Sequence, residues 1–497
     1  MWLEHVEGSV LTTYITFTCA AGFALFGYDQ GIFGGLLQNE SFVKTFNAPD
    51  STLEGQITAT YDLGCFFGAL FAMWLGDKSG RKRTILWGCV VLIIGATIQA
   101  TSFRVSQLIV GRFVAGLGNG MNTAAIPVWQ SETAAARHRG RFIILQLFLN
   151  QVGNVIAQWI NYGLTFVAGN SVAWRFPLAF QCVFAILTLI FLPWLPESPR
   201  WLIMKARNEE AFSVLKRLGA SSRTEQCNTE VFNAIVQNVR HEMEARRLSF
   251  KALTKSDSLH TTRRVLLGAG TQLMQQWGGI NVINYYLPVV FSSLGITRNL
   301  SLILSACNAM NLMISTCFGA LYIETFGRKR MMLWGAVGQS VCFTLVAIGL
   351  ALATKPWEAV AVAFVFAYYT TFGLSWIAVP WMYPAEINTQ RMRIAGAGIA
   401  TATNWINNYI VVLVTPIGIS NIGWKYYLIY AVLNAVFVPV LGYFYVETAG
   451  LSLEQIDTMF ESKYAIESLP IDSTFEQKTE RSDDDKGAHM PQIVHTE

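Results

Sequence analysis

The sequence predicts an all-α membrane protein with twelve transmembrane helices in two pseudo-symmetric six-helix bundles. The chain of 497 residues is 53% apolar and only 14% charged, whereas soluble domains carry about 25% charged residues. Its apolar residues gather in runs of roughly 20, long enough for a helix to cross a hydrocarbon core ~30 Å thick. Charged motifs recur between these runs 247 to 254 residues apart. The chain is therefore a duplication of one unit.

The predicted spans follow one another closely along each half. They cover residues 11–37, 55–76, 84–103, 107–129, 140–163, 174–195, 263–288, 300–323, 331–353, 357–383, 394–418 and 424–446. The first half is residues 1–195 and the second is residues 263–446. Residues 196–262 form a polar, partly helical connector. Residues 447–497 form a polar tail with the composition of a disordered segment.

The placement of positive charge predicts the topology. Twelve Lys and Arg residues lie in four short loops, at 77–83, 137–141, 328–330 and 391–393. The positive-inside rule places these loops, both termini and the connector in the cytoplasm. Two Asn-x-Ser sequons, at Asn39 and Asn299, then fall outside, where glycosylation occurs. The basic loops are topology signals, so no nucleic-acid partner is predicted.

Few ionisable residues fall well inside the predicted spans, where a buried charge is costly and marks function by default. Asp29 lies in the first span and Arg112 opens the fourth. We expect both to face one cavity, because desolvation and a nearby arginine act in opposite directions on a carboxyl, which suits a proton site. The alternative is a fixed ion pair between helices. Asp62, early in the second span, is more typical of a helix interface.

Amide and aromatic residues of the second half predict a ligand site. Gln275, Gln276 and Asn281 lie in the seventh span, beside a Gly-Gly pair. Amides both donate and accept hydrogen bonds, which suits a polyhydroxylated ligand. Trp381, in a tenth span broken by prolines, and Asn404 in the eleventh complete the set. Interhelical hydrogen bonding and packing are the alternatives.

The repeated loop motifs predict a latch at the cytoplasmic ends of the spans. Acidic residues and arginines occupy matched places in the two halves, and we expect them to hold the halves together when the inside is closed. The alternative, isolated surface ion pairs, is worth under ~1 kcal/mol each. The predicted latch residues are Glu132, Arg139, Glu197, Glu386, Arg393, Glu447, Arg81 and Arg328.

This combination of motifs resembles the sugar porter family of the major facilitator superfamily, over about residues 12–457. The motifs are the two Gly-Arg-Lys-Arg turns, Gly111-Arg-Phe113, Pro196-Glu-Ser-Pro-Arg200, Gln275-Gln276 with Asn281, and Pro380-Trp381. The wording Tyr61-Asp-Leu-Gly-Cys65 is similar to the fungal branch. The resemblance implies the major facilitator fold and a central sugar site at the second-half residues named above. It also implies proton coupling through Asp29 and Arg112. Leu147 stands where the family has a glutamine in the fifth span.

The predicted function is proton-coupled transmembrane transport of a sugar or sugar-like polyol by alternating access, at the plasma membrane. A sugar uniporter, an exporter of a polyhydroxylated metabolite and a non-transporting nutrient receptor remain alternatives. No nucleophile–base pair, metal-ligand spacing or phosphate loop is present, so we predict no enzyme activity, cofactor or metal. The expected partners are the small-molecule substrate, protons and the lipid bilayer, and we expect a monomer.

Overall fold

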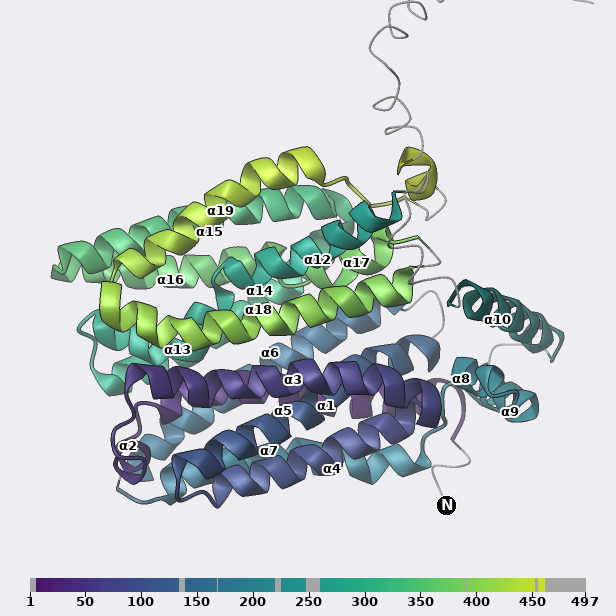
Figure 1. Ribbon diagram of the computed structural model, residues 1–497, viewed down its shortest axis with the longest axis horizontal. Helices are drawn as coiled ribbons and strands as arrows, with labels where there is room; N and C mark the ends of the chain where they lie inside the picture. Colours follow the sequence, from purple (N-terminus) through teal and green to yellow (C-terminus); the bar gives the residue numbers. More distant parts are fainter. Residues whose placement is uncertain are drawn as a thin grey trace, which may run out of the picture.

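The computed structural model describes residues 6–133, 139–167, 169–219, 225–246, 260–389, 392–451 and 455–460. Most of the predicted tail, the side chain of Arg139 and parts of the connector lie outside these described residues. The described part of the chain is helical and contains no strand. Figure 1 shows the long helices running side by side in two groups, coloured purple to blue and teal to yellow.

The first bundle contains six long helices and the short helix α2 (Glu40–Thr45). The long helices are α1 (Gly8–Leu36), α3 (Ser51–Ser79), α4 (Arg81–Ala100), α5 (Val105–Thr133), α6 (Arg139–Gly163) and α7 (Val172–Phe191). Short 3-10 turns follow α6 and α7, at Leu164–Val167 and Leu192–Trp194.

The second bundle also contains six spans, two of which are broken. The unbroken spans are α14 (Arg298–Phe326), α15 (Arg328–Leu352), α18 (Arg393–Ile422) and α19 (Lys425–Phe444). The seventh span is α12 (Thr261–Trp277) and α13 (Ile280–Ser293), and the tenth is α16 (Lys355–Ser375) and α17 (Val379–Ile387). The seventh breaks at Gly278–Gly279, where Gly279 has φ of 92°, a conformation that favours glycine.

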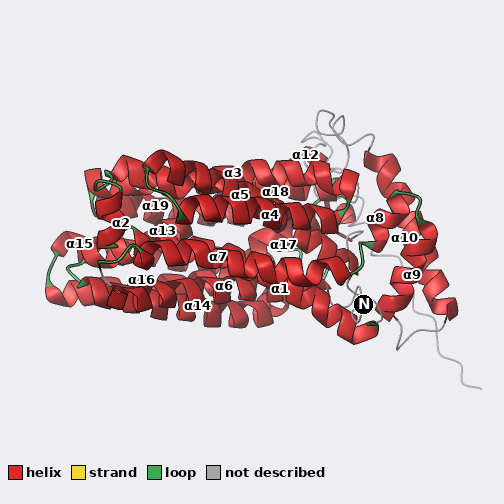
Figure 2. Ribbon diagram, turned by 90° about the horizontal axis from the view of Figure 1, so that it is seen from below, coloured by secondary structure: helices red, strands yellow, loops and turns green. Residues whose placement is uncertain are grey.

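Three connector helices lie together at one end of the molecule (Figure 2). They are α8 (Pro199–Met204), α9 (Asn208–Gly219) and α10 (Glu225–Arg246). A small apolar cluster, including Trp201, Leu202 and Val239, joins them. We call this end the connector end and the opposite end the α2 end.

Hydropathy alone identifies nine of the twelve spans among the described residues. The other three are α5, α6 and the α12–α13 pair. The α5 and α6 helices carry buried polar residues such as Arg112 and Asn150, and α12 and α13 are each shorter than a bilayer. Their backbones are still helical, because a chain in lipid must satisfy its own N–H and C=O groups. The three spans that hydropathy misses are therefore spans whose polar residues or breaks lie in the interior of the protein.

Small residues set how closely the helices approach. A Cβ added to Gly116 of α5 would lie 2.1 Å from the backbone oxygen of Tyr61 in α3, and one added to Gly64 would lie 2.3 Å from the oxygen of Phe113. The α3–α5 contact is therefore backbone to backbone, as at small-residue interfaces between membrane helices. The two bundles meet chiefly where α3 packs on α18, α6 on α14 and α1 on α13.

Candidate functional site

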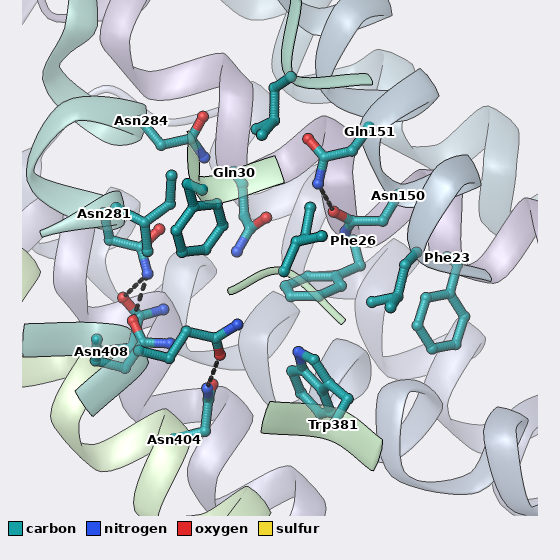
Figure 3. A pocket seen from close by; sticks show the side chains of 17 residues that line it. Phe23, Phe26, Gln30, Asn150, Gln151, Asn281, Asn284, Trp381, Asn404 and Asn408 are labelled. Carbon is teal, nitrogen blue, oxygen red and sulfur yellow. Dashed lines mark hydrogen bonds between the residues drawn. The ribbon is translucent and has the colours of Figure 1, made fainter. Parts of the chain in front are cut away.

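A cavity lies between the two bundles, midway along the helices. The space between its walls is about 630 Å³, a volume that includes open solvent at its mouth. Figure 3 shows amide side chains from both bundles around it, with Trp381 on one side. It is lined by Phe23, Phe26, Gln30, Leu147, Asn150, Gln151, Gln275, Gln276, Ile280, Asn281, Asn284, Leu312, Phe372, Ile377, Trp381, Asn404 and Asn408. All five predicted ligand residues are in this set.

Two of these five residues, Gln275 and Asn404, already use their polar atoms in hydrogen bonds within the protein, including one to each other. Gln275 donates from Nε2 to the backbone oxygen of Trp376 at 2.8 Å, and its Oε1 accepts from Asn404 Nδ2 at 3.1 Å. Asn404 Nδ2 also donates to Gln272 Oε1 at 2.6 Å. These bonds tie α12 to α18 and to the break between α16 and α17. Gln275 and Asn404 therefore form part of the wall, and a ligand must compete with these bonds to use them.

The broken seventh span supplies a second amide group. Asn281 donates from Nδ2 to Gln276 Oε1 at 2.6 Å and to Asn408 Oδ1 at 2.7 Å. The break frees the carbonyl of Gly278, which accepts from the Tyr368 hydroxyl at 2.9 Å. A non-helical stretch at membrane depth is stable where neighbours satisfy its backbone in this way. The break thus turns Gln276 and Asn281 toward the same space.

The wall that α6 contributes was not predicted. Asn150 and Gln151 line the cavity and bond to each other, Gln151 Nε2 donating to Asn150 Oδ1 at 2.8 Å. Asn150 Nδ2 and Gln151 Oε1 are buried with no partner among the described residues. A sequence signal existed, because Gln146, Asn150, Asn154 and Gln158 repeat every four residues and so share one helix face.

The Asp29–Arg112 pair forms, but not where we expected it. Arg112 Nη1 lies 2.9 Å from both carboxyl oxygens, and the two side chains are 0% and 1% exposed. Arg112 also donates to the backbone oxygens of Ile57 and Thr58 in α3. Neither residue lines the cavity, so the expectation that both face it is wrong for this conformation. The adjacent residue, Gln30, faces the cavity instead.

The guanidinium of Arg112 is covered by aromatic rings. Its central carbon lies 4.0 Å from the ring centre of Phe33 and 4.4 Å from that of Tyr61. Cation–π contacts of this kind stabilise a desolvated arginine. The pair therefore joins α1, α3 and α5 within the first bundle, behind the wall of the cavity.

Asp62, which the sequence assigned to a helix interface, touches the other bundle. Its Oδ1 accepts hydrogen bonds from the Tyr285 hydroxyl at 3.2 Å and from Asn408 Nδ2 at 3.0 Å. Asp62 is fully buried, and its Oδ2 has no partner among the described residues. Because Asn408 lines the cavity, the buried carboxyl group of Asp62 belongs to the site through this contact.

The latch residues of the first bundle form one network at the connector end. Arg81 donates to both oxygens of Glu132 at 3.0 and 3.1 Å. Glu132 also accepts from the Ser198 hydroxyl at 2.6 Å. Glu197 accepts from the backbone N–H groups of Arg81, Lys82 and Ser198. Burial raises the pKa of the Glu197 carboxyl, and these N–H groups oppose that effect.

The second bundle repeats this arrangement. Arg328 donates to Glu386 at 2.8 and 3.1 Å and to Glu324 at 2.7 and 2.8 Å. Glu386 accepts from the Thr448 hydroxyl at 2.6 Å. Glu447 accepts from the backbone N–H of Arg328 at 2.7 Å. The duplication seen in the sequence is thus a duplication of contacts.

These described latch contacts stay within one bundle. Glu132 pairs with Arg81, and Glu386 pairs with Arg328. The other two predicted latch arginines are Arg139 and Arg393. The side chain of Arg139 lies outside the described residues, and Arg393 is the first residue of α18. In this conformation the described hydrogen bonds of these networks join helix ends inside each bundle.

Three of the described hydrogen bonds between the bundles lie away from these networks. Asn154 bonds to Asn284 at 3.1 Å beside the cavity. Further along, Gln38 donates to Ser292 at 2.8 Å, and Ser420 donates to Ser51 at 3.2 Å. These three hydrogen bonds join the bundles between the level of the cavity and the α2 end.

Both sequons lie at the same end. The Asn39 side chain caps α2 by accepting from the N–H groups of Ser41 and Phe42. Asn299 is exposed, in the first turn of α14. The two asparagines therefore share one end of the molecule, opposite the basic loops.

Comparison with known proteins identifies the fold and the family. The family model for sugar (and other) transporters matches residues 15–460. The chain is 44% identical to the MFS-type transporter oryC of Aspergillus oryzae, covering 93% of this chain and 87% of that one. It is 39% identical to the sugar transporter STL1 of Saccharomyces cerevisiae, covering 92% and 83%. Both fungal relatives are transporters rather than enzymes.

A solved structure shares the arrangement of helices. The proton:xylose symporter XylE, of the major facilitator superfamily, bound to 6-bromo-6-deoxy-D-glucose, superposes with a TM-score of 0.77 at 24% identity. The match covers 91% of this chain and all of that one. A partially occluded inward-open form of XylE from E. coli gives a TM-score of 0.76. The twelve-helix arrangement in two bundles is therefore the major facilitator fold.

Proposed function

Because the chain belongs to the sugar (and other) transporter family, we propose that it carries a sugar or sugar-like polyol across the membrane together with a proton. Transport proceeds by alternating access, in which the cavity opens to one side at a time as the bundles rock. The connector end is cytoplasmic, with both termini, and the α2 end faces outward with the sequons. The protein works as a monomer in the plasma membrane.

The amide-lined cavity is the observation that carries this proposal. Gln276, Asn281, Asn150 and Gln151 surround one space from both bundles. Two of their polar atoms, Asn150 Nδ2 and Gln151 Oε1, have no partner in the part of the chain that the structure describes, and buried polar atoms without partners are costly. Sugar hydroxyls, which donate and accept, satisfy such atoms. Trp381 offers a flat apolar face for the C–H side of a sugar ring and an N–H for a hydroxyl.

The buried ion pair is the element we assign to proton coupling. Asp29 is charged when both of its oxygens contact Arg112, and a proton on the carboxyl removes that attraction. Because Arg112 also bonds to α3, its release changes how α1, α3 and α5 pack. XylE is a proton:xylose symporter with the same fold, which supports a coupled mechanism here.

The drive is sufficient for accumulation of substrate. One proton moving through ~100 mV supplies about 2.3 kcal/mol, and one pH unit adds about 1.4 kcal/mol. Together these energies support an accumulation ratio on the order of several hundred.

An uptake panel in yeast cells that lack their own sugar transport tests the proposal. Labelled sugars, uronic acids and polyols are offered with and without a protonophore. We expect at least one sugar or polyol to accumulate, and the protonophore to abolish accumulation. Asp29→Asn should retain exchange of that substrate but lose accumulation and substrate-linked alkalinisation. Accumulation that survives in Asp29→Asn would refute the coupling assignment, and a panel with no transported sugar or polyol would refute the substrate class.

A further inference from the structure

Asp62 joins the two bundles in the interior of the protein. It lies in the part of α3 nearer the α2 end, and its two donors, Tyr285 and Asn408, belong to α13 and α18 of the second bundle. The other charged contact described between the bundles pairs Arg298 with Glu40 at 3.7 Å, and Glu40 is 82% exposed there. Exposed pairs contribute little, whereas breaking a buried hydrogen bond leaves a polar group without a partner, which is costly.

The Asp29–Arg112 pair does not perform this role. The hydrogen bonds and ring contacts described for Arg112 all go to α1 or α3. The hydrogen bonds of the ion pair therefore lie within one bundle, whereas Asp62, on the same helix as Ile57 and Thr58, bonds across the interface.

The same carboxylate is connected to the cavity. Asn408 Oδ1 accepts from Asn281 Nδ2 at 2.7 Å, and Asn281 also donates to Gln276 at 2.6 Å. Asn408, Asn281 and Gln276 all line the cavity. A ligand hydroxyl that recruits these amides competes with the bonds that orient Asn408 toward Asp62.

The helix that Asp62 holds is poorly anchored by its own backbone. The Gly278–Gly279 break precedes α13, and Tyr286 within it has non-helical angles, φ −119° and ψ 17°. It rests on α1 at Gly34, where an added Cβ would lie 2.9 Å from the Tyr285 oxygen and from the Pro288 ring. A short helix interrupted on both sides of Tyr285 depends on side-chain contacts for its position.

We propose that Asp62 is a positioning residue that holds α13 against α1 and α3, closes the outer side of the cavity, and senses the ligand through Asn408 and Asn281. This inference rests on the proposed alternating access. Removal of the contact shifts the protein toward conformations in which the cavity opens at the α2 end. The loss of one buried hydrogen bond accounts for a shift on the order of tenfold.

Labelling from outside the cell measures this opening. A cysteine at the cavity-lining position Leu312 serves as the reporter, and intact cells expressing the full chain receive a membrane-impermeant maleimide. The chain without Leu312→Cys gives the background labelling of the native cysteines, which is subtracted. The chain with Leu312→Cys alone is the parent with which the variants are compared. We expect Tyr285→Phe to raise the labelling rate of Leu312→Cys by roughly tenfold. Asp62→Leu should raise it at least as much, and the double variant no further, because both act on one contact.

The control is Tyr430→Phe, which also removes a buried tyrosine hydroxyl bond, but one to Tyr426 within α19. Its labelling rate should equal that of the parent. If Asp62→Leu does not reach the membrane, the conservative Tyr285→Phe decides the question alone. The inference is overturned if Tyr285→Phe labels like the parent, or if Tyr430→Phe labels as fast as Tyr285→Phe.

Failure of the broader proposal has a different signature. Without alternating access, the reporter would not react from outside in any variant, and the uptake panel would show no transport. If only the Asp62 contact is wrongly assigned, the parent still transports and still labels slowly, and the variants match it.

Discussion

Breaking the buried Asp29–Arg112 pair should destabilise the protein far more than removing it entirely. The perturbations are Asp29→Leu, Arg112→Met and the double variant. In the structure, Nη1 lies 2.9 Å from both oxygens and the side chains are 1% and 0% exposed. Unit charges ~4 Å apart attract by about 4 kcal/mol at an effective dielectric constant of 20.

Each single variant leaves one charge buried without its partner. Such a change costs roughly 3–5 kcal/mol, most of it for the stranded charge. The double variant removes both charges and their desolvation, so its unfolding free energy should lie close to that of the parent. Some loss remains, because the Arg112 bonds to the oxygens of Ile57 and Thr58 disappear as well.

Thermal unfolding of the four purified proteins in detergent is the assay. Gln339→Leu is a suitable control, since Gln339 is buried in the second bundle and its amide nitrogen has no partner among the described residues. Its transition should stay near that of the parent. A double variant as unstable as the sum of the two single variants would refute the reasoning, because the two side chains would then act independently.

Three further outcomes are expected from the packing and the polar contacts. Gly116→Ala should lower the unfolding free energy by roughly 1–3 kcal/mol in thermal unfolding, because its Cβ meets backbone; Gly442→Ala, with nothing within 4 Å, should not. Gln151→Leu should raise the half-saturating concentration of the transported ligand severalfold in uptake assays, as one hydrogen bond to the ligand is lost; a value equal to that of the parent would contradict this. Arg328→Ala should lower thermal stability by about 1–3 kcal/mol, because Glu386 loses its charged partner in a half-buried place; a melting temperature equal to that of the parent would contradict this.

The helical spans could be predicted because each is a local property of the sequence. A run of apolar residues must form a helix in lipid to satisfy its own backbone, and the repeated loop motifs reveal the duplication without any knowledge of packing. The same locality explains why Gln276, Asn281 and Trp381 were found. Amides and tryptophan inside a span are unusual wherever they point.

The partners of these residues could not be predicted in the same way. Arg81 and Glu132 are 51 residues apart in the chain, and no local pattern in the sequence joins them. Asp29 lies next to the cavity-facing Gln30, and a rotation of α1 by one residue separates a lining position from one behind the wall. Hydropathy carries no information about that rotation.

The sequence by itself determined the twelve spans, the two related halves and most of the polar residues of the site. Tertiary structure decided which of them meet: that Asp29 pairs with Arg112 behind the cavity, that Asn150 and Gln151 complete its wall, and that Asp62 reaches across to Tyr285. The reason is physical. A helix forms from interactions within four residues of itself, whereas its rotation and depth depend on how surfaces hundreds of residues apart fit together.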